Sequence, residues 1–148
     1  MKTAPTSLPH ILLVGDNRDG RLVRRLLLEE LGCCVEVAIN GEEGLKLFEA
    51  SNFDVVVVDH RMPRMNGVEM IARVRAANAN VRTILLSSLV EPLGLTEENT
   101  GADAVIAKNA AEPAHLARSV KRLLNRAPAR KPPGRQKAAG SRARATAR

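Results

Sequence analysis

Four polar residues, each at the end of a short apolar run, form a set that suits phosphate chemistry. They are Asp16, Asp59, Ser87 and Lys108. Two carboxylates suit a divalent cation, and a hydroxyl and an ammonium suit the oxygens of a phosphate group. Each residue alone is more often a cap, a turn residue or a solvated side chain. Together they favour one shared site.

Five apolar runs predict the strands that would position these residues. The runs span residues 11–14, 35–38, 55–58, 83–86 and 104–107. Each is rich in Val, Ile, Leu or Ala and is apolar at nearly every position. That pattern is typical of parallel strands covered on both faces.

Helical patterns lie between and after these strands. The predicted helices span residues 21–31, 41–50 and 67–77, and a last helix starts near Pro113. Asp19 is the expected N-cap of the first helix, and Gly32 follows its end. Residues 88–102 contain Pro92 and Gly94 without sustained apolar periodicity, so any helix there should be short.

Five strand–helix units in this order predict an α/β fold, a three-layer sandwich with a five-stranded parallel sheet. Right-handed crossovers place helices on both faces of such a sheet. Ligand sites in open sheets of this kind lie at the carboxyl ends of the strands. We therefore expect the four polar residues to meet at one edge.

The length and the cysteines fit one ordinary domain. A chain of 148 residues can bury a substantial core without disulfides or metal. The two cysteines, Cys33 and Cys34, are adjacent and are expected to be reduced thiols. No apolar run approaches the length of a transmembrane segment, and the N-terminus does not resemble a secretory signal. These features predict a cytoplasmic protein.

Charge divides the chain into a near-neutral body and a basic tail. The net charge is +7, and the segment from Arg126 to the end holds eight Lys or Arg and no acidic residue. We predict an N-terminal extension over 1–8, one domain over 9–126 and a disordered basic tail over 127–148. The tail is either a solvated extension or a polycation that contacts nucleic acid, anionic lipid or an acidic protein without sequence readout.

Four stretches carry a resemblance to a known family. "DVVVVDHRMPRMNGVEM" resembles the phosphoacceptor segment of two-component response regulator receiver domains. "ILLVGDN" is similar to their acidic first-strand end, "ILLSS" to their hydroxyl-bearing fourth strand and "GADAVIAKN" to their fifth-strand lysine. The resemblance covers about residues 9–126, and it implies a flavodoxin-like sheet with strand order 2-1-3-4-5.

The resemblance also implies roles for individual residues. Asp59 would accept a phosphoryl group from a histidine kinase or phosphotransfer protein. Mg²⁺ would be held by Asp16, Asp59 and the backbone carbonyl of Arg61. Lys108 would pair with one phosphoryl oxygen, and Ser87 would donate a hydrogen bond to another. The chain would then be a stand-alone receiver, not an enzyme, that signals by contact with a downstream protein target as yet unknown.

Three positions depart from the family pattern. Gly15 stands where the family usually has a first acidic residue, Val105 where it often has an aromatic gate, and Asn109 where a proline usually follows the lysine. The departures at Gly15 and Val105 keep a second hypothesis open, a pseudo-receiver that acts as an interaction module without phosphorylation. Arg61 either shields the acyl phosphate from water or lies in solvent.

Two other classes fit less well. A phosphatase with an aspartate nucleophile would need a second Asp soon after Asp59, and "DHRMP" has none. A flavin-binding protein would need a loop rich in Ser, Thr and Gly after the first strand, where "GDNRDG" is highly charged.

Overall fold

Five short strands form one parallel sheet, as the apolar runs predict. In this computed structural model, which describes residues 8–125, the strands are β1 (His10–Val14), β2 (Cys34–Ala38), β3 (Val55–Asp59), β4 (Arg82–Ser87) and β5 (Ala104–Ala107). Their order is β2-β1-β3-β4-β5, which confirms the predicted topology. The basic tail predicted over 127–148, and residues 1–7 of the predicted N-terminal extension, lie outside the described residues.

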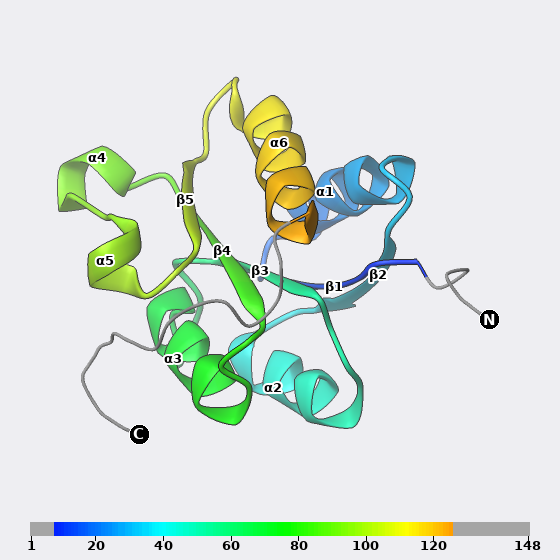
Figure 1. The fold of residues 1–148 in the computed structure, drawn as a ribbon. Helices are drawn as coiled ribbons and strands as arrows, with labels where there is room; N and C mark the ends of the chain where they lie inside the picture. Colours follow the sequence, from blue (N-terminus) through cyan, green and yellow to red (C-terminus); the bar gives the residue numbers. More distant parts are fainter. Residues whose placement is uncertain (1–7, 126–148) are drawn as a thin grey trace.

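Helices cover both faces of this sheet. They are α1 (Arg18–Glu30), α2 (Gly41–Ala50), α3 (Gly67–Ala77), α4 (Val90–Leu93), α5 (Glu97–Thr100) and α6 (Glu112–Asn125). Figure 1 shows α1 and α6 on one face and α2 and α3 on the other, so the molecule has three layers. The helices α4 and α5 have four residues each, which confirms that residues 88–102 form only short helices.

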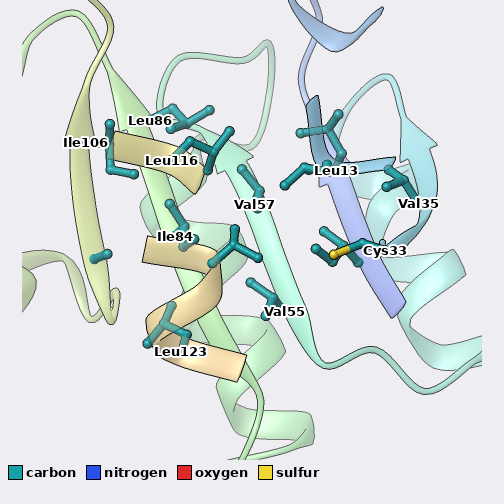
Figure 2. Packing of buried hydrophobic residues seen from close by; sticks show 14 residues of the cluster. Leu13, Cys33, Val35, Val55, Val57, Ile84, Leu86, Ile106, Leu116 and Leu123 are labelled. Carbon is teal, nitrogen blue, oxygen red and sulfur yellow. The ribbon is translucent and has the colours of Figure 1, made fainter. Parts of the chain in front are cut away.

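Each strand sends alternate side chains into two separate cores. Leu13, Val57 and Ile84 face α1 and α6, where Leu116 and Leu123 of α6 pack against the sheet (Figure 2). Their sequence neighbours, such as Leu12 and Val58, belong to the core beneath α2 and α3. Because both faces are buried, the strands are apolar at almost every position.

The strand register sets the edge where the polar residues lie. Val14 pairs with Val58, Asp59 with Leu86, and Ser87 with Ala107. The carboxyl ends of the four strands β1, β3, β4 and β5 are therefore nearly level. Residues that follow these ends share one edge of the sheet.

The start of α1 differs from the prediction. The helix begins at Arg18, and its N-cap is Asn17, whose side chain accepts a hydrogen bond from the Gly20 amide at 2.7 Å. The prediction that Asp19 is the N-cap is wrong. Asp19 lies inside the first turn, where its negative charge interacts favourably with the helix dipole. The predicted end is confirmed, since Gly32 follows Leu31 with a φ of 92°.

Two further expectations concern the cysteines and membrane segments. Cys33 is buried and Cys34 exposed, and both are free thiols, as expected. Within residues 8–125, every helix is too short or too polar to cross a membrane.

Candidate functional site

Asp59 and Lys108 meet at the carboxyl edge of the sheet. Asp59 is the last residue of β3 and is 2% exposed. Lys108 follows β5, and its Nζ lies 3.3 Å from Oδ1 of Asp59. The Lys108 amide donates to the Ser87 carbonyl at 3.0 Å, which extends the sheet by one hydrogen bond. The parallel pairing thus brings together two residues that lie 49 positions apart.

The buried position of Asp59 changes its protonation. Burial raises the pKa of the Asp59 carboxyl above its ordinary value, and the nearby Asp16 carboxylate adds to this effect. Lys108 and Arg24 act in the opposite direction, but they do not fully compensate for the lost hydration. The ionised carboxylate is therefore costly in this site, and nearby cations stabilise it.

Ser87 lies on the neighbouring strand end, and its hydroxyl is engaged locally. The side chain is buried, and Oγ accepts a hydrogen bond from the Leu89 amide at 2.9 Å. Nδ1 of His60 shares a second hydrogen bond with the same Oγ at 3.2 Å. Burial and the nearby Arg61 and Lys108 lower the pKa of His60, so its imidazole is neutral at pH 7. His60 is a partner of Ser87 that the sequence patterns do not reveal.

Asp16 and Arg61 line an open pocket beside Asp59. Both side chains are exposed, and the pocket measures about 500 Å³. It is also lined by His60, Met62, Pro63, Asn66 and Leu89. The pocket gives the carboxylate of Asp16 direct access to solvent and ions.

The oxygen donors at this edge fit Mg²⁺ in their chemistry. Asp16 is close enough to Asp59 for its charge to contribute to the raised pKa of Asp59. Magnesium is commonly held by one or two carboxylates and keeps several waters. Side chains alone do not form a metal site in the described part of the chain. Among residues 8–125, no three His, Cys, Asp or Glu side chains gather closely enough to hold a metal ion.

Arg24 is the main site residue that the sequence patterns miss. It projects from α1, and its Nη1 lies 3.7 Å from Oδ1 of Asp59. Nε and Nη2 donate to the two carboxylate oxygens of Glu112, the first residue of α6, at 2.7 and 3.1 Å. Ion pairing with Glu112 and Asp59 raises the pKa of Arg24 despite the opposing effect of burial, so this side chain stays charged.

Gly15 lies directly against the Asp59 carboxylate. A Cβ built at Gly15 would overlap Oδ2 of Asp59 and would lie 3.0 Å from its Cγ. The Gly15 carbonyl accepts a hydrogen bond from Nη1 of Arg21 at 2.7 Å, which ties this strand end to α1. The position that lacks an acidic side chain is thus filled by the carboxylate of Asp59 itself.

Asn109 organises the loop that follows Lys108. Its side-chain oxygen accepts a hydrogen bond from the Ala111 amide at 2.8 Å, and its carbonyl accepts one from the Glu112 amide at 3.0 Å. The loop therefore leads directly into the first turn of α6. This turn therefore connects Lys108, which pairs with Asp59, to Glu112, which pairs with Arg24.

Comparison with known sequences finds one family. Residues 11–121 match the family model described as the response regulator receiver domain. A curated relative, the probable transcriptional regulator ycf27 of Cyanidium caldarium, is 32% identical over 100 residues. That match covers 67% of this chain and 40% of the relative, so the chain spans less than half of the relative's length.

Comparison with solved structures also finds response regulators. The response regulator TrrA of Thermotoga maritima in complex with Mg²⁺-BeF is 30% identical, with a TM-score of 0.71 over 78% of this chain and 99% of that one. A second structure contains histidine kinase ThkA in complex with TrrA. The match there is 32% identical, with a TM-score of 0.68, and covers 79% of this chain and 99% of the other.

The raised pKa of Asp59 predicts a pH-dependent effect of Asp59→Asn on stability. Because the folded state binds the Asp59 proton more tightly than the unfolded chain, this group favours folding below its unfolded pKa. That contribution is lost as the pH rises through the folded pKa. We expect Asp59→Asn to be more stable than the wild type at pH 7, by a margin that shrinks toward pH 4. Urea denaturation of both proteins at the two pH values measures it, and a margin that grows on acidification would contradict it.

The contact at Gly15 predicts that even a methyl group there is costly. Gly15→Ala should lower the free energy of unfolding by about 1 to 3 kcal/mol, because the added methyl group forces the buried Asp59 carboxylate out of its present position. The same change in an Asp59→Ala background should cost less, with a coupling of about 0.5 to 3 kcal/mol. Chemical denaturation of the four proteins gives this coupling. Additive effects would show that the two positions do not compete for space.

Proposed function

This chain belongs to the response regulator receiver domain family, and from that premise we propose that Asp59 accepts a phosphoryl group from a histidine kinase or phosphotransfer protein. The observation that carries the proposal is the buried Asp59 carboxylate with Lys108 Nζ 3.3 Å from it. In its ionised form, a carboxylate beside an ammonium is a nucleophile with a partner for the incoming oxygens.

The transfer step follows from this arrangement. An oxygen of Asp59 attacks the phosphorus, an O–P bond forms, and the bond from phosphorus to the donor nitrogen of phosphohistidine breaks, with the electron pair leaving on the histidine. Lys108 pairs with one phosphoryl oxygen as the acyl phosphate forms. Arg61 is exposed and lines the pocket beside this site.

The donor chemistry supports Mg²⁺ as the cofactor. Asp16, Asp59 and the backbone carbonyl of Arg61 would hold the ion, and when bound it reduces the repulsion between the carboxylate and the phosphoryl oxygens. The related TrrA was solved with Mg²⁺-BeF, which is consistent with this assignment.

Ser87 would report the phosphoryl group to the surface. To donate to a phosphoryl oxygen, the Ser87 hydroxyl must turn toward the site, and a rotation that moves Oγ would change its hydrogen bonds with His60 and with the Leu89 amide. Leu89 is the N-cap of α4, so the change would reach that short helix. Val105 is half-buried against the core at this edge and offers no aromatic ring that could swing. The Ser87 loop and α4 are therefore the proposed output route.

The proposed role is signalling by protein contact in the cytoplasm rather than turnover of a substrate. A histidine kinase is the expected donor, since ThkA and TrrA were solved as a complex. The downstream protein target, and contact of the basic tail over 127–148 with nucleic acid or an acidic surface, stay predictions from the sequence.

The pseudo-receiver hypothesis keeps one observation in its favour. Asp59 lies against Gly15, so the pocket has one carboxylate fewer than the pattern that it resembles, and Arg24 faces the remaining Asp59 carboxylate as a second cation beside Lys108. A domain with this pocket could act as an interaction module without phosphorylation. The two hypotheses differ in whether Asp59 forms an acyl phosphate.

Incubation with acetyl phosphate and saturating Mg²⁺ separates them. We expect intact-mass spectrometry to find one added phosphoryl group on the wild type and none on Asp59→Asn, because only the carboxylate can form the acyl phosphate. Asp54→Asn is the matched control, since Asp54 is an exposed carboxylate at the opposite end of β3, and it should be phosphorylated like the wild type. An unmodified wild type would favour the pseudo-receiver.

A further inference from the structure

Arg24 is a cation of the site for which the proposed function has no role. Its Nε and Nη2 form a bidentate pair with Glu112, and its Nη1 faces Asp59 at 3.7 Å. The Arg24 and Glu112 side chains are 11% and 12% exposed. A guanidinium held by two parallel hydrogen bonds is fixed in orientation, so its remaining nitrogen is aimed at one place.

The room for this guanidinium depends on Gly20, four residues earlier on α1. A Cβ at Gly20 would lie 2.8 Å from Nη1 and 3.5 Å from Cζ of Arg24. Glycine inside a helix costs roughly 1 kcal/mol relative to alanine. The helix therefore gives up stability at the position where Arg24 needs space. Gly15 plays a matching part for Asp59, because its missing side chain lets the carboxylate lie at the strand end.

Phosphorylation increases the need for positive charge at this point. A phosphoryl group carries roughly −1.5 to −2 charges and three acceptor oxygens, whereas the free carboxylate carries one charge. At 3.7 Å, Nη1 is too far from Oδ1 for a direct hydrogen bond. An added phosphoryl group supplies acceptors beside a donor that is already in place. Arginine suits such oxygens better than other side chains do, because its fork matches their geometry.

We propose that Arg24 is a phosphoryl-binding residue of this site and that, together with Lys108, it lets Asp59 accept and hold a phosphoryl group without a bound divalent cation. The proposal rests on the proposed function, since it requires phosphorylation of Asp59. Glu112 is the positioning residue that keeps Nη1 aimed at the group. Arg24 and Lys108 together supply the charge that Mg²⁺ would otherwise provide.

With acetyl phosphate as the donor, the step balances without a metal. An Asp59 oxygen forms a bond to phosphorus, the P–O bond to the acetyl group breaks, and acetate leaves with the electron pair. Nη1 of Arg24 and Nζ of Lys108 donate to the phosphoryl oxygens. No proton or further reactant is needed, because Asp59 reacts as the carboxylate.

The test compares adduct formation in excess EDTA with that in saturating Mg²⁺, measured by intact mass on the full chain. The wild type should react in EDTA at a rate within about tenfold of its rate with Mg²⁺. Arg24→Gln should lose at least about tenfold in EDTA and recover with Mg²⁺. Arg24→Lys, which keeps the charge but not the fork, should fall between them. Arg25→Gln is the matched control on the same helix, since Arg25 is exposed and pairs with Glu29, and it should behave like the wild type.

A binding measurement gives a second readout that does not depend on phosphorylation. Calorimetric titration of the unphosphorylated proteins with Mg²⁺ should show roughly tenfold tighter binding to Arg24→Gln than to the wild type, because the guanidinium repels the ion. A merely structural role for Arg24 would weaken Mg²⁺ binding or leave it unchanged.

The possible results distinguish a failure of this inference from a failure of the proposed function. A wild type that needs Mg²⁺ as strongly as Arg24→Gln does would overturn this inference alone, as would a loss in Arg24→Gln that Mg²⁺ does not repair. Mg²⁺ binding to Arg24→Gln that is no tighter than to the wild type would also overturn it. No adduct on the wild type under either condition would overturn the proposed function, and this inference with it.

Discussion

The balance of charge around the buried Asp59 carboxylate is the constraint on which the rest of the site depends. A carboxylate that is 2% exposed loses most of its hydration, and it is stable in its ionised form only beside cations. Lys108 supplies one cation from the end of β5, and Arg24 supplies another from α1. Residues that have no direct part in phosphoryl transfer then have a structural role in the site. Gly15 makes room for the carboxylate, Gly20 makes room for the guanidinium, and Glu112 fixes the direction in which the guanidinium points.

The fold brings these groups together because a parallel sheet has all its carboxyl ends on one edge. The level register of β1, β3, β4 and β5 places Asp59, Ser87 and Lys108 at neighbouring strand ends along that edge. The pair between Arg24 and Glu112 then joins α1 to α6 across the same edge, so both helices of one layer contact the charge network. A change of charge at Asp59 would therefore act on that layer through Arg24 and on α4 through Ser87.

The sequence predicts the sheet and the strand-end residues well, since both depend on local patterns. Continuous apolar runs mark buried strands, and Asp59 and Lys108 follow such runs directly. Arg24 and Glu112 are not predictable in this way, because they lie on helix surfaces where arginine and glutamate are usually solvated. Gly20 gives no warning either, because it precedes the helix predicted over 21–31 and its place inside α1 is known only from the structure. The predicted N-cap of α1 was wrong for a related reason. Asn and Asp are both favoured at N-caps, and only the backbone conformation shows that Asn17 rather than Asp19 is the cap.

The central claim is that Arg24 stabilises the ionised Asp59 carboxylate, and a double-mutant cycle at pH 7 tests it most directly. The free energy of unfolding is measured by urea denaturation for the wild type, Arg24→Gln, Asp59→Asn and the double variant. If Arg24 stabilises the charge, replacing Asp59 by Asn gains more stability when Arg24 is absent, by a coupling of about 0.5 to 3 kcal/mol. Effects that add to within about 0.5 kcal/mol would show that the guanidinium does not act on Asp59, and would contradict the account.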